Sequence, residues 1–197
     1  MAIDVAQIRK AIAEPWPASS DFDLNPGLAL PSSRILTPAA VLIGLWDRPN
    51  GLQLILTKRA SHLQHHPGQI AFPGGKVDPT DADAEAAALR EADEEIALPA
   101  KCVQTLGQLP AHETVTGFRI TPIVGLIVAD FDPRPEAGEV EEVFTVPLSH
   151  VLQSANFGIE RRLWRGEWRR YYAVPYGPYY IWGATARILR GLAERVC

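Results

Sequence analysis

The stretch of residues 82–98 constrains the fold of this chain more than any other feature of its sequence. It consists almost entirely of Ala, Leu, Glu, Asp and Arg, and Pro99 follows it directly. Alanine, leucine, glutamate and arginine are the best helix formers, and a proline disfavours helix at the residue before it. We therefore predict a helix over residues 82–98.

One face of this helix carries three carboxylates, those of Glu91, Glu94 and Glu95. With 3.6 residues per turn, the three side chains fall within about 100° of arc. Like charges at these spacings destabilise an exposed helix by roughly 0.2–0.5 kcal/mol per pair, and Arg90 relieves the repulsion only in part, through Glu94. A divalent cation such as Mg²⁺ or Mn²⁺ binds carboxylate oxygens and would remove it. The alternative is a solvated face, which is common on glutamate-rich helices.

Two consecutive glycines, Gly74 and Gly75, precede the helix and follow a strand-like segment at residues 69–72. Glycine is required where the backbone takes a positive φ or approaches another group closely. A glycine pair alone is common in turns. A glycine loop that leads into a helix with three carboxylates is far rarer, and the combination favours a metal site over a solvated face.

Both ends of the chain have the apolar spacing of amphipathic helices. This spacing predicts one helix at residues 3–13 and another at residues 180–195. Between the first helix and the first strand, residues 21–38 are rich in Pro, Ser and Gly. This composition predicts an extended connector on the surface.

Apolar, β-branched stretches in the rest of the chain predict one mixed β-sheet. The first two stretches are separated by Asn50 and Gly51, a strong turn signal, and predict an antiparallel hairpin. A second hairpin is predicted at residues 163–168. The predicted strands of the sheet are residues 39–46, 52–57, 103–109, 120–129 and 140–146. Helices combined with a mostly antiparallel sheet indicate an α+β fold, layered as an α/β/α sandwich.

Length, charge and cysteine content exclude several classes of protein. A chain of 197 residues fits one domain, and a net charge of −4 argues against a nucleic-acid binder, which would carry a basic face. The cysteines form no CxxC pair, so we expect neither a disulfide framework nor a zinc site. Charged residues interrupt the apolar N-terminal segment, which leaves no signal peptide or membrane span. We therefore expect a cytoplasmic protein with no nucleic-acid or membrane partner.

The glycine loop and the helix together resemble the Nudix box, whose pattern is G-x5-E-x7-R-E-U-x-E-E-x-G-U, with U a bulky aliphatic residue. The resemblance runs from Gly75 to Leu98 and keeps the central R-E-x-x-E-E. The residues that match within the helix are Arg90, Glu91, Glu94, Glu95 and Leu98.

The sequence departs from this pattern in three places. The spacing from Gly75 to Arg90 is one residue longer, Ala82 stands in place of the early glutamate, and Ala97 stands in place of the late glycine. An acidic residue of the loop or of the first helical turn can replace the missing glutamate. The candidates are Asp78, Asp81 and Glu85.

Residues 55–75 resemble the signature of the coenzyme A pyrophosphatase branch of this family, L-L-T-x-R-[SA]-x3-R-x3-G-x3-F-P-G-G. Most fixed positions agree, but Gln64 stands where the signature has arginine. Residues 181–186 also look like this branch, and the whole resemblance covers roughly residues 37–189. We therefore expect one Nudix hydrolase domain in residues 1–197, with residues 1–36 as its N-terminal helix and connector.

The resemblance implies the Nudix fold and a catalytic group formed by Arg90 with the metal ligands Glu91, Glu94 and Glu95. It also implies metal-assisted attack of water on a diphosphate. For coenzyme A or an acyl-coenzyme A, the products would be 3',5'-ADP and (acyl-)4'-phosphopantetheine. ADP-ribose or another nucleoside diphosphate derivative is the alternative substrate. A non-catalytic nucleotide sensor is a third hypothesis, against which the intact glutamates argue.

Residues outside the helix complete the candidate site. Arg59 follows a strand and can aim its guanidinium at a substrate phosphate, or can be an ordinary surface arginine. The candidate substrate contacts are Arg59, Gln69, Gly74 and Gly75. Glu139 and Glu142 begin the strand at residues 140–146, and either can complete the metal site or act as general base. The alternative for both is a charged edge strand.

The second hairpin combines basic and aromatic residues. It can bind an additional phosphate and an adenine ring, although a charged hairpin or the edge of a homodimer is the favoured interpretation. Its residues of this kind are Arg161, Arg162, Trp164, Arg165, Trp168, Arg169 and Arg170. For the histidines at positions 62, 65 and 66 we expect a hydrogen-bonding or surface role, because they have no thiolate or evident second shell beside them.

Overall fold

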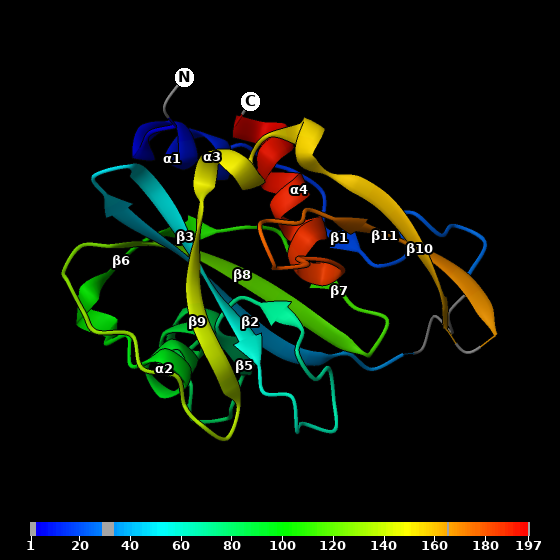
Figure 1. Cartoon of the computed structure of the whole chain (residues 1–197), viewed down its shortest axis with the longest axis horizontal. Helices are drawn as coiled ribbons and strands as arrows, with labels where there is room; N and C mark the ends of the chain where they lie inside the picture. The colour runs from blue at the N-terminus through cyan, green and yellow to red at the C-terminus, as the bar shows by residue number, and fades with distance from the viewer. Residues whose placement is uncertain (1–2, 29–33, 165, 197) are drawn as a thin grey trace.

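A mixed β-sheet lies between two layers of helices (Figure 1) in the computed structural model, which describes residues 3–28, 34–164 and 166–196. One face of the sheet is covered by α2 (Ala84–Ile96). The opposite face is covered by α1 (Val5–Ala13), α3 (Leu148–Val151) and α4 (Ala184–Val196). This arrangement confirms the predicted α+β fold and its α/β/α layers. Within the described residues, no helix is long and apolar enough to cross a membrane.

Three long strands form the centre of the sheet: β2 (Thr37–Arg48), β3 (Gly51–Arg59) and β8 (Phe118–Ile127). Strand β2 pairs with β3 in the predicted antiparallel hairpin and runs parallel to β8. Strand β9 (Val140–Pro147) pairs with β3, and β6 (Val103–Gln108) pairs with β8, both antiparallel. The sheet is therefore mixed and mostly antiparallel, as predicted.

Most of the short elements have no counterpart in the predictions, because two or three residues are too few to show a hydrophobic period. The exception is β4 (Ile70–Ala71), which lies within the strand-like segment predicted at residues 69–72. Strands β4 and β5 matter most, since they pair with β3 and β2 and carry the residues around the glycine pair. The short strands are β1 (Ser19–Ser20), β4 (Ile70–Ala71), β5 (Gly74–Lys76) and β7 (His112–Glu113). Two short 3-10 helices are η1 (Ala100–Cys102) and η2 (Ser154–Asn156).

Strands β10 (Gly158–Trp164) and β11 (Glu167–Ala173) form a separate antiparallel arm, which projects from the body at the right of Figure 1. The hairpin predicted at residues 163–168 is the tip of this longer arm, and Arg165 lies outside the described residues. One face of the arm exposes three apolar side chains, those of Ile159, Leu163 and Trp168. The homodimer edge stays a prediction for this face.

Helix α2 is shorter than predicted at both ends. It begins at Ala84 because Asp83 caps it: the Asp83 side chain accepts a hydrogen bond from the Ala86 N–H at 2.8 Å. It ends at Ile96, and Ala97 then takes a left-handed conformation with φ of 56°. Ala97 is the position at which the Nudix pattern has its late glycine, so the backbone conformation is kept without the glycine.

Helix α4 begins at Ala184, later than the predicted residue 180, because the backbone before it bonds to the end of β11. The Val174 N–H donates to the Ile181 carbonyl at 2.8 Å, and the Gly183 N–H donates to the Tyr172 carbonyl at 3.1 Å. Residues 180–183 are therefore held beside β11 and cannot join the helix. The connector predicted at residues 21–38 includes residues 29–33, which lie outside the described residues.

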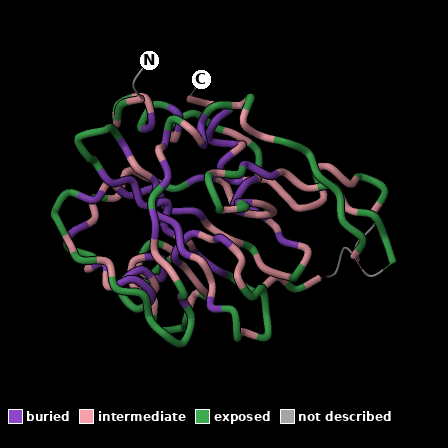
Figure 2. Tube along the Cα trace, in the orientation of Figure 1, coloured by how far each residue is buried: buried purple, intermediate pink, exposed green. Residues whose placement is uncertain are grey.

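Two hydrophobic cores lie on the two faces of the sheet, and the buried central strands in Figure 2 separate them. Alternate side chains of β2 enter both cores, Leu42 on the α2 side and Ile43 on the α4 side. Helix α4 contributes large aliphatic residues to its core: Ile188, Leu189 and Leu192. Helix α2 contributes mainly small ones: Ala87, Ala88, Ala92 and Ile96.

Candidate active site

Helix α2 faces the glycine loop across a layer of small side chains. Ala87, Ala88 and Ala92 are fully buried, and side chains of this size let a helix approach the strands beneath it. Strand β5, which contains Gly74 and Gly75, pairs with β2 and packs against α2. The structure therefore brings the predicted glycine loop and the carboxylate face of the helix together.

Both glycines are required by their surroundings. Gly74 has φ of 155°, and a Cβ at this position would lie 2.7 Å from the Cα of Val41. A Cβ on Gly75 would lie 2.5 Å from the Cδ of Glu91. The glycine pair thus allows the backbone of β5 to lie directly against a carboxylate of α2.

Glu95 is a buried carboxylate at the centre of this contact. Its residue is 5% exposed, and its Oε2 accepts a hydrogen bond from the Gly74 N–H at 3.1 Å. Burial raises the pKa of Glu95 to about 8; the Gly74 hydrogen bond and the positive charge of Arg59 oppose this shift, and the charge of Glu91 adds to it. The surrounding protein therefore stabilises the ionised form of Glu95 poorly.

Glu91 and Glu94 lie on the same face of α2 and are both drawn to Arg90. The Arg90 Nη1 donates to Oε1 of Glu91 at 3.0 Å and to Oε2 of Glu94 at 3.2 Å. Burial also raises the pKa of Glu91, and Arg90 opposes that shift. The side chain of Glu94 is 61% exposed. The three glutamates thus range from buried to exposed along one helix face.

Arg90 forms a bidentate ion pair with Asp81, which the sequence had not singled out over Asp78. The Nε and Nη2 of Arg90 donate to the two carboxylate oxygens of Asp81, each at 3.0 Å, and Nη2 also donates to the Lys76 carbonyl at 3.2 Å. Asp78 lies farther from Arg90, at 3.8 Å. This bidentate pair fastens the loop between β5 and α2 to the helix. The expectation that Arg90 acts through Glu94 was therefore incomplete.

Asp81 also explains the unusual spacing of the Nudix box. Counted back from Arg90, the early acidic position falls on Ala82, but counted forward from Gly75 it falls on Asp81. The extra residue therefore lies between Asp81 and Arg90. Glu85, another candidate substitute, accepts a hydrogen bond from Thr105 Oγ1 at 2.7 Å, which gives it a partner outside the site.

The donor set fits a divalent cation, although its side chains are not gathered around one point. Within residues 3–28, 34–164 and 166–196, no three acidic, histidine or cysteine side chains converge closely enough to hold a metal as they stand. Glu91 and Glu94 are held by Arg90, and Glu95 is held by Gly74. Two of these carboxylates are destabilised by burial, and the third is exposed enough to turn towards them. A hard cation with oxygen ligands would offset that destabilisation.

The structure gives Glu139 and Glu142 different surroundings. The charge of Glu139 contributes to the raised pKa values of both Glu91 and Glu95, so Glu139 lies near the carboxylates. Glu142 instead accepts a hydrogen bond at 2.6 Å from the hydroxyl of Tyr179. Of the two candidates, Glu139 belongs with the glutamates of α2 and Glu142 with an aromatic residue.

Arg59 and Gln69 lie at the same end of β3, where the Arg59 N–H donates to the Gln69 carbonyl at 3.0 Å. The Arg59 side chain is half-buried and forms no ion pair within the described part of the chain. Its charge lowers the pKa of Glu95. Arg59 is therefore a cation that faces the carboxylates and has no acidic partner of its own, as a phosphate contact requires.

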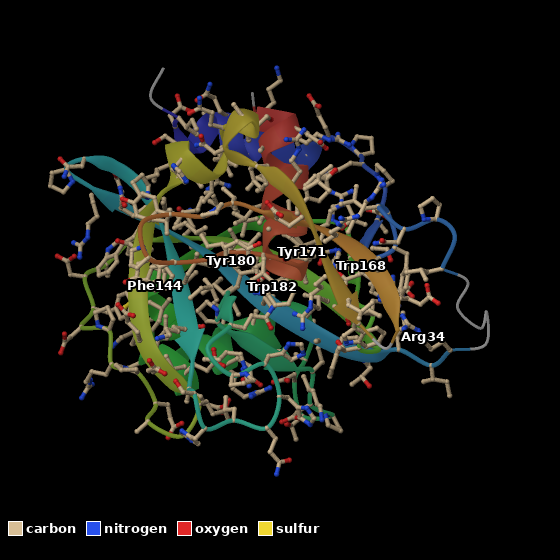
Figure 3. The ribbon with its side chains drawn as sticks, turned by 45° about the vertical axis from the view of Figure 1, so that its right-hand side comes forward. Arg34, Phe144, Trp168, Tyr171, Tyr180 and Trp182 are labelled. Carbon is tan, nitrogen blue, oxygen red and sulfur yellow. The ribbon has the colours of Figure 1, made fainter. Side chains whose placement is uncertain are left out.

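An aromatic cavity opens beside this end of β3, and sequence reasoning missed it. Its volume is about 470 Å³. Figure 3 shows two of its residues, Tyr180 and Trp182, near Tyr171 of the arm. We call this cavity the aromatic cavity. Its lining residues are Lys58, Gly68, Ile70, Glu142, Pro178, Tyr179, Tyr180 and Trp182. The aromatic run at residues 179–182 was the signal that could have indicated it.

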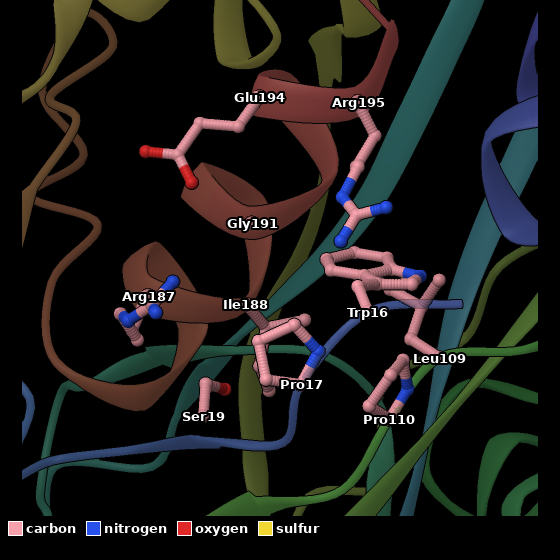
Figure 4. Close-up of a pocket in the computed structure, with 10 residues that line it drawn as sticks. All are labelled: Trp16, Pro17, Ser19, Leu109, Pro110, Arg187, Ile188, Gly191, Glu194 and Arg195. Atoms are coloured by element: carbon pink, nitrogen blue, oxygen red, sulfur yellow. The ribbon is translucent and has the colours of Figure 1, made fainter. Parts of the chain in front are cut away.

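A second cavity, of about 90 Å³, lies between α4 and the segment around Trp16 (Figure 4). It shares no lining residue with the carboxylate site. Its arginines already have partners: Arg187 pairs with Asp23 at 2.7 Å, and Arg195 lies over the Trp16 ring, 4.8 Å from its centroid. This cavity is a packing feature of the α4 layer, and the candidate active site is the carboxylate face of α2.

A mixed sheet between helices, with a carboxylate helix against a glycine loop, defines the class of the protein. The chain belongs to the Nudix domain family, which matches it over residues 36–164. It is 48% identical over 161 residues to the uncharacterized Nudix hydrolase NudL of Enterobacter sp. (strain 638), with 80% of this chain and 82% of that protein covered. It is 46% identical over 158 residues to the NudL of Escherichia coli (strain K12), with the same coverage.

Solved structures of Nudix hydrolases share the fold. A Nudix hydrolase from Alicyclobacillus acidocaldarius has a TM-score of 0.52 and 19% identity, with 84% of this chain and 94% of that chain covered. RenU from M. smegmatis has a TM-score of 0.50 and 21% identity, with coverages of 61% and 83%. The Nudix fold and a diphosphate-cleaving hydrolase are therefore confirmed, and Nudix hydrolases generally use divalent metal ions. The coenzyme A branch stays a prediction.

Proposed function

We propose that this Nudix hydrolase cleaves the diphosphate of coenzyme A or an acyl-coenzyme A, with Mg²⁺ or Mn²⁺ held by Glu91, Glu94 and Glu95. The products are 3',5'-ADP and (acyl-)4'-phosphopantetheine. The substrate is inferred from the agreement of residues 55–75 with the coenzyme A pyrophosphatase signature. The cytoplasm, where coenzyme A and free divalent cations are both present, is the compartment that fits this activity.

One observation carries the reaction: two carboxylates one helical turn apart, Glu91 and Glu95, are both destabilised by burial and lie against the backbone of Gly74 and Gly75. A structural role for such groups would pair each with a cation of the protein. Only Glu91 has one, Arg90, within the described residues, and Arg90 is shared with Asp81 and Glu94. This arrangement favours a bound cation over a solvated helix face.

The chain's own residues then have separate roles. When bound, the metal supplies a hydroxide nucleophile and screens the charge that develops on the phosphate oxygens. Arg59 donates hydrogen bonds to a substrate phosphate. Glu139 is exposed beside the glutamates of α2 and accepts the proton of the attacking water as general base. Arg90 is a positioning residue, because it holds Glu91 and the loop that contains Asp81.

The substrate is tested by comparing coenzyme A with ADP-ribose, each with Mg²⁺ and with Mn²⁺. We expect coenzyme A to have the higher kcat/KM and to give 3',5'-ADP and 4'-phosphopantetheine. Mass spectrometry of the products formed in ¹⁸O-water would identify the attacked phosphorus, because the label enters only the phosphate that water attacks. Efficient cleavage of ADP-ribose beside inert coenzyme A would keep the reaction and replace the substrate. No turnover of either compound with either metal would contradict the proposal.

A further inference from the structure

The aromatic cavity has rigid walls built by the segment between β11 and α4. Tyr176 and Tyr179 exchange two backbone hydrogen bonds, each of 2.9 Å. The Tyr179 ring stacks on Phe144 of β9, with ring centroids 3.6 Å apart and planes 8° from parallel. At the start of α4, the Thr185 hydroxyl donates to the Ile70 carbonyl at 3.2 Å. The walls are therefore formed before any ligand enters, which lowers the entropic cost of binding.

The arm contacts the Trp182 ring through two of its residues. Tyr171 meets Trp182 edge to face, with ring centroids 5.1 Å apart. The guanidinium of Arg162 lies over Trp182, 5.0 Å from the ring centroid. Both residues belong to the same face of the arm, opposite the face that exposes Trp168. The arm thus fixes an aromatic wall of the cavity and places a cation at its edge.

The polar groups of the aromatic cavity are few and specific. The Oε1 of Glu142 is occupied by the Tyr179 hydroxyl at 2.6 Å, and Oε2 has no hydrogen-bond donor within the described residues. Lys58 pairs with Glu141 at 2.6 Å. Flat aromatic walls with one available carboxylate acceptor suit a planar ring that carries an exocyclic amine. They suit a flexible acyl or pantetheine chain less, because such a chain presents no ring to stack.

The aromatic cavity and the carboxylates lie within reach of one nucleotide. Ile70 lines the cavity and Gly74 contacts Glu95, and an extended chain spans at most about 14 Å between these two residues. The Gly68 N–H donates to the Arg59 carbonyl at 3.1 Å, and Gly68 and Lys58 both line the aromatic cavity. The cavity therefore adjoins the end of β3 that carries Arg59.

We propose that the aromatic cavity binds the adenine ring of the substrate, with Trp182 and Tyr180 against the ring and Glu142 accepting a hydrogen bond from its exocyclic amine. This inference rests on the proposed function, since it places one end of the same substrate. The diphosphate then extends past Arg59 towards α2, and the pantetheine end lies outside the aromatic cavity. Glu142, a catalytic candidate in the sequence, becomes a specificity residue.

The first test measures binding of the product halves without metal, by isothermal titration calorimetry. Trp182→Ala should weaken binding of 3',5'-ADP by roughly fivefold to 100-fold, the range for loss of one base–aromatic stack. Binding of 4'-phosphopantetheine should not change. Trp168→Ala is the matched control, because Trp168 is 60% exposed on the other face of the arm. Trp182→Phe, which keeps a ring, should retain most of the affinity and shows that loss of folding is not the cause.

The second test addresses the carboxylate. Wild-type protein should bind AMP more tightly than IMP, which has an oxygen in place of the amine, and Glu142→Gln should narrow this preference. In turnover, Glu142→Gln should raise KM with little change in kcat. A large fall in kcat at unchanged KM would instead assign Glu142 to the chemistry and overturn the proposal. Weaker 4'-phosphopantetheine binding to Trp182→Ala, with 3',5'-ADP unaffected, would also overturn it.

These binding measurements are independent of hydrolysis. If coenzyme A is not cleaved but AMP binding depends on Trp182, the adenine site stands and the choice of substrate fails. If coenzyme A is cleaved but the affinity for nucleotides is unchanged by substitutions of Trp182 and Glu142, the choice of substrate stands and the adenine site fails.

Discussion

Helices α2 and α4 lie on opposite faces of one sheet and are built for different purposes. Helix α4 packs through large aliphatic side chains, including Leu189 and Leu192. Helix α2 packs through alanines and buries the carboxylate of Glu95 among them. Apolar burial stabilises the fold by about 25 cal/mol per Å², whereas a buried carboxylate destabilises it unless it is paired. Stability therefore comes mainly from the α4 face, and the α2 face gives up stability to present charge.

The strongest test of this comparison pairs one substitution from each helix. Glu95→Gln should lower kcat by at least about 100-fold, because a metal ligand is lost, and should leave the free energy of unfolding unchanged or higher. Leu189→Ala, at a position fully buried in the α4 core, should lower the free energy of unfolding by about 2–5 kcal/mol and leave the kcat of the folded protein intact. Urea titration and steady-state kinetics measure both quantities.

Two results would break the comparison. Wild-type turnover of Glu95→Gln at saturating Mg²⁺ would remove Glu95 from the metal ligands. A loss of stability in Glu95→Gln as large as that in Leu189→Ala would show that the buried carboxylate supports the fold.

A smaller effect is expected from Gly75→Ala. This substitution displaces the Glu91 carboxylate without removing its charge. The added methyl group would meet the Glu91 carboxylate, so we expect kcat/KM to fall about tenfold to 100-fold as the carboxylate is displaced. The matched control is Gly44→Ala in β2, where a Cβ would make ordinary contacts of 3.7 Å or more. Equal activity of the two variants would show that Glu91 does not need its position against β5.

The last prediction concerns the pH dependence of stability without metal. The pKa of Glu95 is raised from 4.5 to about 8 in the folded protein, so the folded state binds a proton more tightly than the unfolded state. Its contribution to stability is complete below pH 4.5 and is lost as the pH rises towards 8. The slope is at most about 1.4 kcal/mol per pH unit. Chemical denaturation across this range should show the slope in wild-type protein and lack it in Glu95→Gln. A wild-type slope identical to that of the variant would contradict the buried, protonated Glu95.

Local geometry made the carboxylate helix predictable from the sequence. The placement of Glu91, Glu94 and Glu95 on one face depends only on helical spacing, and the glycine pair marks a close approach that the structure contains. The same reasoning found the layers and the central hairpin, because long strands show their periods. Strand alternation could not have separated Glu139 from Glu142 in the same way, because Glu139 precedes the first residue of β9.

Contacts between distant segments were not predictable in this way. The aromatic cavity joins Lys58 of β3 with Tyr179 and Trp182, which reach it only through the turns before α4. The register of β9 on β3 also shifts between Lys58 and Arg59. No local pattern in the sequence specifies a bulge of this kind or the segment that lies beside it.

The pairing of Arg90 with Asp81 has a consequence for the way relatives of this chain are recognised. A search pattern that fixes the spacing from the early acidic residue both to the glycine and to the arginine does not match this sequence. Such a pattern places Ala82 at the acidic position and misses Asp81. A pattern that fixes only the spacing from the glycine to the acidic residue, and allows one inserted residue before the arginine, matches the sequence with Asp81 in the acidic position. The helix cap at Asp83 lies within that interval, and a surface turn there can lengthen by one residue while both anchors keep their contact. In this chain, the extra residue therefore lies between the acid and the helix, where the backbone can accommodate it.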